Sequence, residues 1–251
     1  GEDEEMTGPE HGQGAPATKT ITYSRIVNLS HTVHSGIPQW PGDPPVEFQE
    51  VATLVRDGYY LRRFSMGEHS ATHINAPIAF HPGGLSIDAY SAESLTAPAV
   101  VIDVEERCSD NPGYALSAAE VVGWEDRHGP VPPNAVVLLQ TGWQRKWHDT
   151  VAYQGAEPNG EPRFPGFNHD AARFLIDQRA IAGLGTDTAG LEPGWDGNFS
   201  VNKILLEQPR IALENLTNLD LLPPTGITLV IGILRLQGGS GSPVSVTAFV
   251  D

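Results

Sequence analysis

Short apolar segments alternate with helical ones through the middle of the chain, and this order limits the folds that the chain can adopt. Residues 97–104 and 135–140 are apolar runs of strand length. Between them, Ser117 and Glu120 form the Ser-x-x-Glu pattern that begins many helices. Strand and helix segments interleave, and there is no internal repeat of about 20 to 50 residues. The chain is therefore predicted to be an α/β protein.

The remaining segments extend this plan into one domain. Asp57-Gly58 is a hairpin signal between two strand-like segments. A chain of 251 residues can bury one substantial core, so we predict a single domain over 21–251. Residues 1–20 are polar, rich in Gly, Glu and Pro, and are predicted to be a disordered tail. The further predicted strands are 21–29, 46–54, 59–65, 181–185, 227–236 and 244–250, and the further predicted helices are 169–179 and 201–207.

The composition excludes several classes of partner. The formal charge is −16 and no run of basic residues occurs, which argues against nucleic acid or an anionic membrane as a partner. No apolar run reaches the roughly 18 residues of a membrane span, so a soluble protein is expected. Whether it is cytoplasmic, or exported after removal of a leader, stays open. The single cysteine, Cys108, cannot form an intramolecular disulfide and lies in a segment that is predicted to be a loop.

Three of the nine histidines, His69, His73 and His81, lie within thirteen residues. Two imidazoles four residues apart can converge on one metal ion, and Asn75 offers an amide oxygen nearby. The simpler interpretation is that each histidine only forms hydrogen bonds within a loop. Other catalytic patterns have no support: the glycine-rich segment 238–242 is not a nucleophile elbow, and no glycine loop for nucleotide phosphates is present.

The histidine segment resembles the signature of the metal-dependent cyclase/hydrolase family, which includes bacterial kynurenine formamidase, isatin hydrolase and trans-dienelactone hydrolase. That signature runs approximately His-x-Gly-Thr-His-x-Asp-Ala-Pro-x-His-Phe. Several separated motifs in the family's order extend the resemblance over about Ile26 to Val250. The matching blocks are His69 to Phe80, Leu29-Ser30-His31 through Trp40-Pro41-Gly42-Asp43, Gly185-Thr186-Asp187-Thr188, and Glu214-Asn215-Leu216-Thr217-Asn218-Leu219.

The chain departs from the family pattern at positions that carry chemistry. Asn75 stands where the family has an aspartate that binds metal, and Ala79 where it has a histidine that transfers protons. Dinuclear relatives hold a second metal with a histidine and a glutamate twelve residues apart. The corresponding pair here is Asn202 and Glu214, so the spacing is kept without the histidine.

The resemblance implies a swivelling β/β/α fold, in which a central mixed sheet curls toward a barrel with helices outside, and assembly as a homodimer or homotetramer. It implies one divalent ion, Zn²⁺ or Mn²⁺, held by His69 and His73 with Asn75 beside them. The expected activity is hydrolysis of a small cyclic ester or amide by metal-activated water. Glu214 and His81 are the candidates for proton transfer. Trp40, Asn202 and Asp187 are the candidates for substrate contacts.

The departures keep two other hypotheses open. In one, the pocket has lost its metal and performs cyclisation, dehydration or isomerisation with Glu214 and His81. In the other, the chain is a degenerate relative that binds a small molecule without converting it. Asp187 is preferred over Glu192 and Asp196, because it lies in a matched block, whereas the latter two are predicted to be solvated turn residues.

Overall fold

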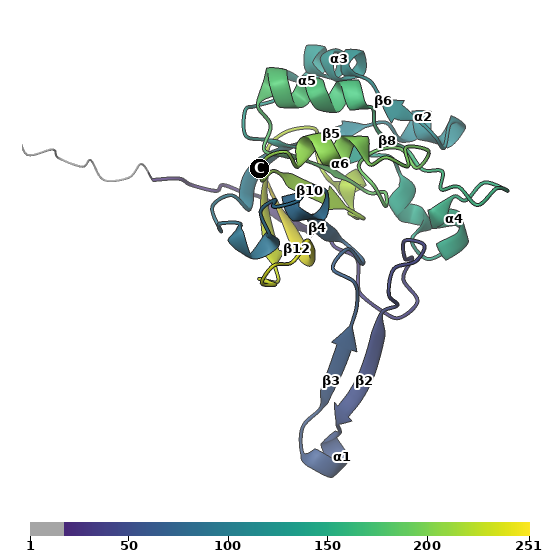
Figure 1. The fold of residues 1–251 in the computed structure, drawn as a ribbon. Coiled ribbons are helices and arrows are strands. Elements are labelled where there is room, and N and C mark those ends of the chain that lie inside the picture. Colours follow the sequence, from purple (N-terminus) through teal and green to yellow (C-terminus); the bar gives the residue numbers. More distant parts are fainter. Residues whose placement is uncertain (1–17) are drawn as a thin grey trace, which may run out of the picture.

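A mixed sheet that closes on itself forms the centre of the protein (Figure 1). The computed structural model describes residues 18–251, so most of the predicted tail lies outside the described residues. Strand β1 (Arg25–Asn28) pairs with β12 outside the closed part. In order round the barrel, the strands are β12 (Gly241–Val250), β11 (Ile227–Ile233), β5 (Thr96–Asp103), β7 (Val136–Gln140), β9 (Gly183–Thr186), β10 (Ile211–Glu214) and β4 (His73–Asn75), which pairs again with β12.

Half of this barrel is parallel and carries the helices. Strands β5, β7, β9 and β10 run parallel, whereas β11, β12 and β4 pair antiparallel with their neighbours. Parallel neighbours need long crossover connections, and here helices supply them. The helices are α2 (Glu105–Asp110), α3 (Ala118–His128), α4 (Thr150–Gln154), α5 (His169–Arg179) and α6 (Ser200–Leu205). In Figure 1, α3 and α5 lie together above the sheet, whereas α4 lies lower, on the right.

Both faces of the parallel half are buried, which explains the continuous apolar runs in the sequence. On β7, Val137 and Leu139 pack with the helices in one core cluster that includes Trp124. Val136 and Leu138 belong to the second cluster, which contains residues of the other barrel strands. Because successive side chains point to opposite faces, one apolar strand serves both cores. The predicted α/β fold with a barrel-like mixed sheet and flanking helices is confirmed.

The predicted helix start at Ser117 is confirmed. The Ser117 side chain accepts from the Glu120 amide, and the Glu120 carboxylate accepts from the Ser117 amide, so α3 begins with a capping box. The prediction that Cys108 lies in a loop was wrong. Cys108 is buried in α2 rather than placed in a loop, and burial raises the pKa of its thiol to about 12.

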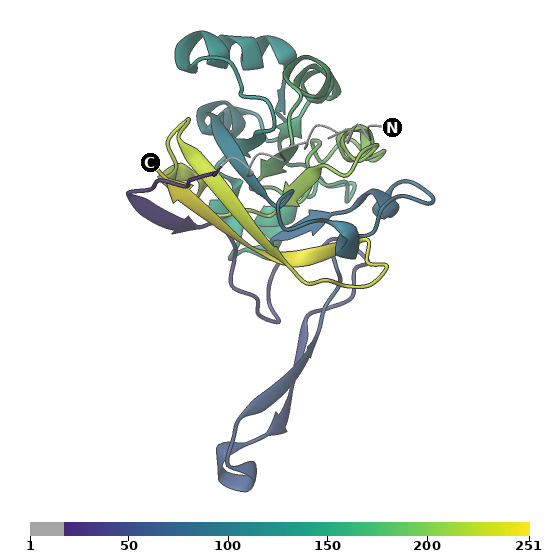
Figure 2. The same cartoon turned by 90° about the vertical axis from the view of Figure 1, so that its left-hand side faces the viewer.

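A two-stranded arm projects from the body of the protein (Figures 1 and 2). It consists of β2 (Glu47–Ala52), the short helix α1 (Leu54–Asp57) and β3 (Leu61–Ser65). Gly58 ends α1 with φ 76°, a left-handed conformation that glycine adopts without strain. The hairpin predicted around Asp57-Gly58 is therefore present, with one helical turn at its tip. Large apolar side chains along the arm are exposed, among them Leu54, Val55, Tyr59, Tyr60 and Phe64.

The remaining regular structure is short. A parallel pair, β6 (Ala115–Leu116) and β8 (Gly166–Phe167), lies outside the barrel. Within residues 18–251 no helix has the length and the apolar composition that a bilayer crossing requires. The 3₁₀ turns are η1 (Pro77–Ala79), η2 (Ile87–Ala89), η3 (Trp143–Lys146) and η4 (Leu219–Leu221).

Candidate active site

A cavity of about 310 Å³ opens beside strands β4 and β10. It is large enough for a small bicyclic molecule. These two strands and helix α6 contribute four of its polar side chains, His73, Asn75, Glu214 and Asn202. The polar lining residues include Gln39, Asp43, His69, Ser70, His73, Asn75, Tyr153, Glu192, Asn202, Glu214 and Asn215, and the aromatic ones include Trp40, Phe80, Phe164 and Phe199.

Strand pairing brings the histidine segment to Glu214. Strand β4 is paired on both edges, and its register with β10 places His73 directly opposite Glu214. His73 Nε2 lies 2.9 Å from a Glu214 carboxylate oxygen, and both side chains are buried. Residues i and i+2 of a strand share one face, so Asn75 lines the same cavity as His73. The turn before β4 supports this arrangement: Ala71 has φ 56°, and its carbonyl accepts from His73 Nδ1 at 2.9 Å.

The orientation of the two buried amides follows from their partners. Asn202 Nδ2 lies 3.0 Å from Glu192 and 2.8 Å from Glu214, and only an NH₂ group can donate to two carboxylates. Asn202 Oδ1 therefore accepts from Asn75 Nδ2, at 3.0 Å. This leaves Asn75 Oδ1 facing His69 Nδ1 at 2.7 Å. The amide oxygen of Asn75 is thus presented to the imidazole.

The far nitrogen of His69 is held from outside the cavity. The Ser240 hydroxyl donates to Glu68 at 2.6 Å, so its oxygen accepts from His69 Nε2, which is 2.8 Å away. Each of the two histidines therefore uses one nitrogen to donate to an acceptor behind it. In neutral rings, the other nitrogens, His69 Nδ1 and His73 Nε2, carry lone pairs that face the oxygens of Asn75 and Glu214.

These contacts fit a divalent ion. Two lone pairs that face oxygen atoms need positive charge between them, as protons or as a metal ion. Burial lowers the pKa of His69, and the neighbouring His73 lowers it further, so an added proton on His69 is disfavoured. Metal-binding histidines commonly donate their second nitrogen to an acceptor, as both rings do here. Within residues 18–251 no three His, Cys, Asp or Glu side chains form a metal-binding group, so an ion would need the Asn75 amide oxygen as its third protein ligand.

Two carboxylates of the cavity, Glu214 and Glu192, differ in the pKa that their surroundings give them. Burial alone would raise the pKa of Glu214, but hydrogen bonds and charge from His73, with a further bond from Asn202, bring it below its usual value. Burial raises the pKa of Glu192 to about 7, and the charge of Glu214 raises it in the same direction. Glu192 is 3% exposed and lines the cavity. The prediction that Glu192 is a solvated turn residue was therefore wrong.

The structure does not bring His81 into the cavity. Its Nε2 donates to the carbonyl of Lys203 in α6 at 2.8 Å, and Ala79 and Phe80 occupy the cavity wall instead. The shift of two residues does not turn the imidazole toward the site because Pro77 to Ala79 form a 3₁₀ turn rather than an extended strand. This position corrects the expected proton-transfer role of His81.

We expect His81→Ala to leave turnover within about twofold of the parent rate. The variant loses one hydrogen bond to a backbone carbonyl, which costs about 1 kcal/mol of stability. Steady-state rates and a thermal melt test this directly. A tenfold fall in kcat/KM without loss of fold would return His81 to the reaction.

Asp187 is also placed elsewhere, as a structural anchor. Its carboxylate accepts from the hydroxyl of Thr141 at 2.6 Å and from the Thr141 amide at 3.1 Å. Thr141 follows β7 and Asp187 follows β9, so the bond joins the ends of two adjacent parallel strands. The side chain is fully buried and does not line the cavity, which corrects its expected contact with substrate.

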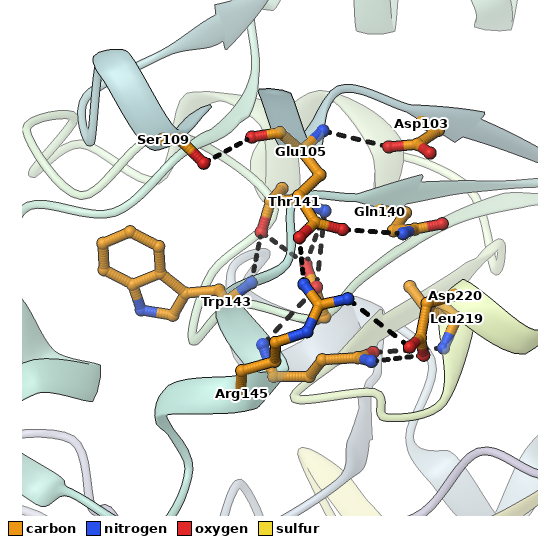
Figure 3. A network of polar contacts seen from close by, with 11 residues as sticks. Asp103, Glu105, Ser109, Gln140, Thr141, Trp143, Arg145, Leu219 and Asp220 are labelled. Atoms are coloured by element: carbon orange, nitrogen blue, oxygen red, sulfur yellow. Dashed lines mark hydrogen bonds and ion pairs between the residues drawn. The ribbon is translucent and has the colours of Figure 1, made fainter. Parts of the chain in front are cut away.

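Thr141, the partner of Asp187, belongs to a polar network at this end of the sheet (Figure 3). Arg145 pairs with Glu105 and with Asp220, and Thr141 also accepts from the amide of Trp143. These bonds connect the segments that follow β5 and β7 with η4. The network therefore holds the scaffold around the cavity rather than contributing to its lining.

Trp40 lies in the cavity wall, as expected. Its ring packs edge to face with Phe164 at 6.2 Å and lies 6.1 Å from Phe199, which in turn contacts Phe80. The cavity therefore combines an aromatic wall with a polar floor. The structure brings together Trp40, His69, His73, Asn75, Asn202 and Glu214 of the predicted residues.

Comparison with known proteins gives consistent matches. A family model described as putative cyclase matches residues 27–193. The chain is 30% identical to isatin hydrolase of Roseibium aggregatum, over 82% of each chain, and 26% identical to kynurenine formamidase of Paracidovorax citrulli, over 86% of this chain and 93% of that one.

Solved structures show the same relationship. Isatin hydrolase A from Ralstonia solanacearum superposes with a TM-score of 0.85 at 31% identity, covering 90% of this chain and 92% of that one. Isatin hydrolase A from Labrenzia aggregata, bound to benzyl benzoate, superposes with a TM-score of 0.84 at 33% identity, covering 90% of this chain and 93% of that one. A protein described as a potential metal-dependent hydrolase with cyclase activity shares the fold. It superposes with a TM-score of 0.68 at 21% identity, covering 90% of this chain and 98% of that one.

Proposed function

Because this chain belongs to the putative cyclase family, we propose that it is a metal-dependent hydrolase of a small cyclic amide or ester. The observation that carries the proposal is the geometry of His69 and His73. Both imidazoles line one cavity, together with Glu214 and several aromatic side chains. Each ring bonds through one nitrogen to Ser240 or Ala71 and turns the other toward Asn75 or Glu214. The relatives named isatin hydrolase and kynurenine formamidase support an amide as the first choice of substrate.

We propose that His69, His73 and Asn75 hold one divalent ion, Zn²⁺ or Mn²⁺. Such an ion lowers the pKa of water and polarises a carbonyl group. The three side chains present two imidazole nitrogens and one amide oxygen. Because Asn75 is neutral where an aspartate would add negative charge, the site holds a divalent ion less tightly than a carboxylate site would.

Glu214 is proposed as the base that removes a proton from the attacking water. It is ionised, buried and in contact with the cavity, which are the properties that a general base needs. Asn202 and the Leu191 amide donate to one oxygen of its carboxylate, and His73 Nε2 lies 2.9 Å from the other. These bonds fix the direction in which the carboxylate can receive a proton.

The walls of the cavity favour a flat substrate with an apolar ring. Trp40, Phe80, Phe164 and Phe199 supply aromatic surfaces on which such a ring can pack. The polar floor then receives the carbonyl group. We propose that substrates are small aromatic or bicyclic compounds with a hydrolysable C–N or C–O bond.

Replacement of Trp40 with Ala is expected to raise KM about tenfold or more with a smaller effect on kcat. The side chain contributes ring contacts that are present in the bound substrate as well as in the transition state, so its loss weakens binding in both. Steady-state kinetics separates the two constants. A fall in kcat alone would contradict a role in the wall.

The proposed function is tested with a panel that contains isatin, an N-aryl formamide and an aromatic lactone. Hydrolysis is followed by the proton released when the acid product ionises. We expect turnover of at least one cyclic member, with loss of turnover after chelation. Unchanged substrate throughout the panel, with metal supplied, would contradict the proposal.

We also propose that the chain assembles as a homodimer or homotetramer. An isolated two-stranded hairpin is marginally stable in water, and the arm exposes Val55, Tyr59 and Tyr60. A second copy that covers these side chains would stabilise the arm.

A further inference from the structure

Two carboxylates of the cavity share one amide group. Asn202 Nδ2 donates to Glu192 at 3.0 Å and to Glu214 at 2.8 Å, and the Asn202 backbone amide donates to the second oxygen of Glu192 at 3.0 Å. Both side chains are almost fully buried, with 3% and 5% exposure, and both line the cavity. Their separation by a single NH₂ group makes simultaneous ionisation unfavourable.

The two members of the pair have different partners. Glu214 also accepts from the Leu191 amide, and a proton or a metal ion between its other oxygen and His73 Nε2, 2.9 Å away, supplies positive charge, so three groups stabilise its charge. Glu192 has only the two bonds from Asn202, and no cation among the described residues pairs with it. When one proton is shared by such a pair, the less supported carboxylate retains it.

A proton on Glu192 can be donated only toward the cavity. Its carboxylate only accepts hydrogen bonds, and across residues 18–251 it donates none. The Asn202 groups beside it are both donors, so neither can receive the proton. Because Glu192 lines the cavity, the proton is available to a molecule bound there.

The cavity offers few other acids. His69 and His73 have partners at both ring nitrogens, and His81 lies outside the cavity. The remaining titratable side chains in the lining are Asp43 and Tyr153, and burial raises the pKa of Tyr153 well above its usual value. Burial and the charge of Glu214 raise the pKa of Glu192 to about 7, which suits proton transfer at neutral pH.

We propose that Glu192 is the general acid that protonates the leaving group. The inference rests on the proposed hydrolysis and adds a catalytic residue to it. Water adds its oxygen to the substrate carbonyl carbon, and Glu214 takes the proton that this water loses. The C–N or C–O bond then breaks as the Glu192 carboxyl proton moves to the departing nitrogen or oxygen. Glu214 later releases its proton to solvent, and Glu192 takes one from solvent.

The test compares a poor with a good leaving group. In a cyclic amide the leaving group is an amine nitrogen that needs a proton, whereas in an activated aryl ester it is a stable phenolate. We expect Glu192→Gln to lower kcat/KM about 10²-fold for the amide and less than about fivefold for the aryl ester. Glu192→Asp should restore part of the amide rate, and Glu106→Gln, at an exposed position, serves as the matched control.

The pH profile gives a second readout. Because the acid must be protonated, kcat/KM for the amide should fall as pH rises through about 7 in the parent protein. This limb should be lost in Glu192→Gln. A carboxyl signal that titrates near neutral pH in ¹³C-glutamate-labelled protein, and is missing from the variant, identifies the group without turnover. Thermal melts check that the variants fold.

The outcomes separate the two proposals. Equal losses for amide and ester, or an unchanged amide rate in Glu192→Gln, would overturn the acid role and leave the hydrolase function intact. A Glu192 carboxyl that stays ionised down to about pH 5 would overturn it as well. A parent protein that hydrolyses neither substrate would contradict the proposed function itself, and with it the acid role.

Discussion

Glu214→Gln is expected to lower kcat by about 10²-fold or more, with little change in KM. Glutamine keeps the shape of the side chain but is neutral and cannot take a proton from water. Its amide oxygen can still accept from Asn202 and the Leu191 amide, and its NH₂ group can face His73 Nε2. The substitution therefore removes the base with limited disturbance of the strand pair.

The measurement is single-turnover kinetics beside a thermal melt. Glu106→Gln, an exposed neutralisation, is the control for the change in charge. If a well-folded Glu214→Gln protein turned over at the parent rate, Glu214 would be a structural residue only.

His73→Ala is expected to abolish measurable turnover and metal binding together. The imidazole contacts the Ala71 carbonyl on one side and Glu214 on the other, so its loss removes a proposed metal ligand and the only basic side chain that pairs with Glu214 among the described residues. A buried charge left without its partner typically costs about 3–5 kcal/mol of stability.

Metal content and a denaturant melt on the same sample separate these effects. His148→Ala removes an exposed imidazole and is the matched control. Added Zn²⁺ or Mn²⁺ should stabilise the parent and the control but not His73→Ala. Equal stabilisation of all three proteins would place the ion elsewhere.

Much of the scaffold was predictable because its segments are long and locally consistent. The capping residues of α3 and the apolar run of β7 determine their own structures, and α5 has the predicted bounds His169–Arg179. Strands β4 and β10 were not predicted. They contain three and four residues, too few for a periodic pattern, and are defined by pairing with strands distant in the sequence.

The candidate site was predictable where motif spacing reflects strand geometry. His73 and Asn75 share a face of β4, and Glu214 lies opposite His73, so these positions converge. Glu192 was missed because its loop contains Gly and Pro and resembles a solvated turn. Only its bonds to Asn202 in the folded chain show that it is buried. Asp187 lay in a matched block and His81 directly after one, but local backbone geometry directs them to Thr141 and Lys203.

The two asparagines that depart from the family pattern, Asn75 and Asn202, have a common physical effect. Asn75 and Asn202 are neutral, and their amides bond to each other, so they connect His69 to the carboxylate pair without adding charge. The site thereby keeps fewer negative charges than a dinuclear site requires. We therefore expect one ion in each chain rather than two.

The single-metal mechanism is tested by elemental analysis of the untagged protein, combined with chelation and return of the metal. We expect about one equivalent of zinc or manganese per chain, loss of hydrolysis on chelation, and recovery when one equivalent is returned. Full activity in metal-free protein would contradict the metal-dependent mechanism, and two equivalents per chain would contradict the single site at His69, His73 and Asn75.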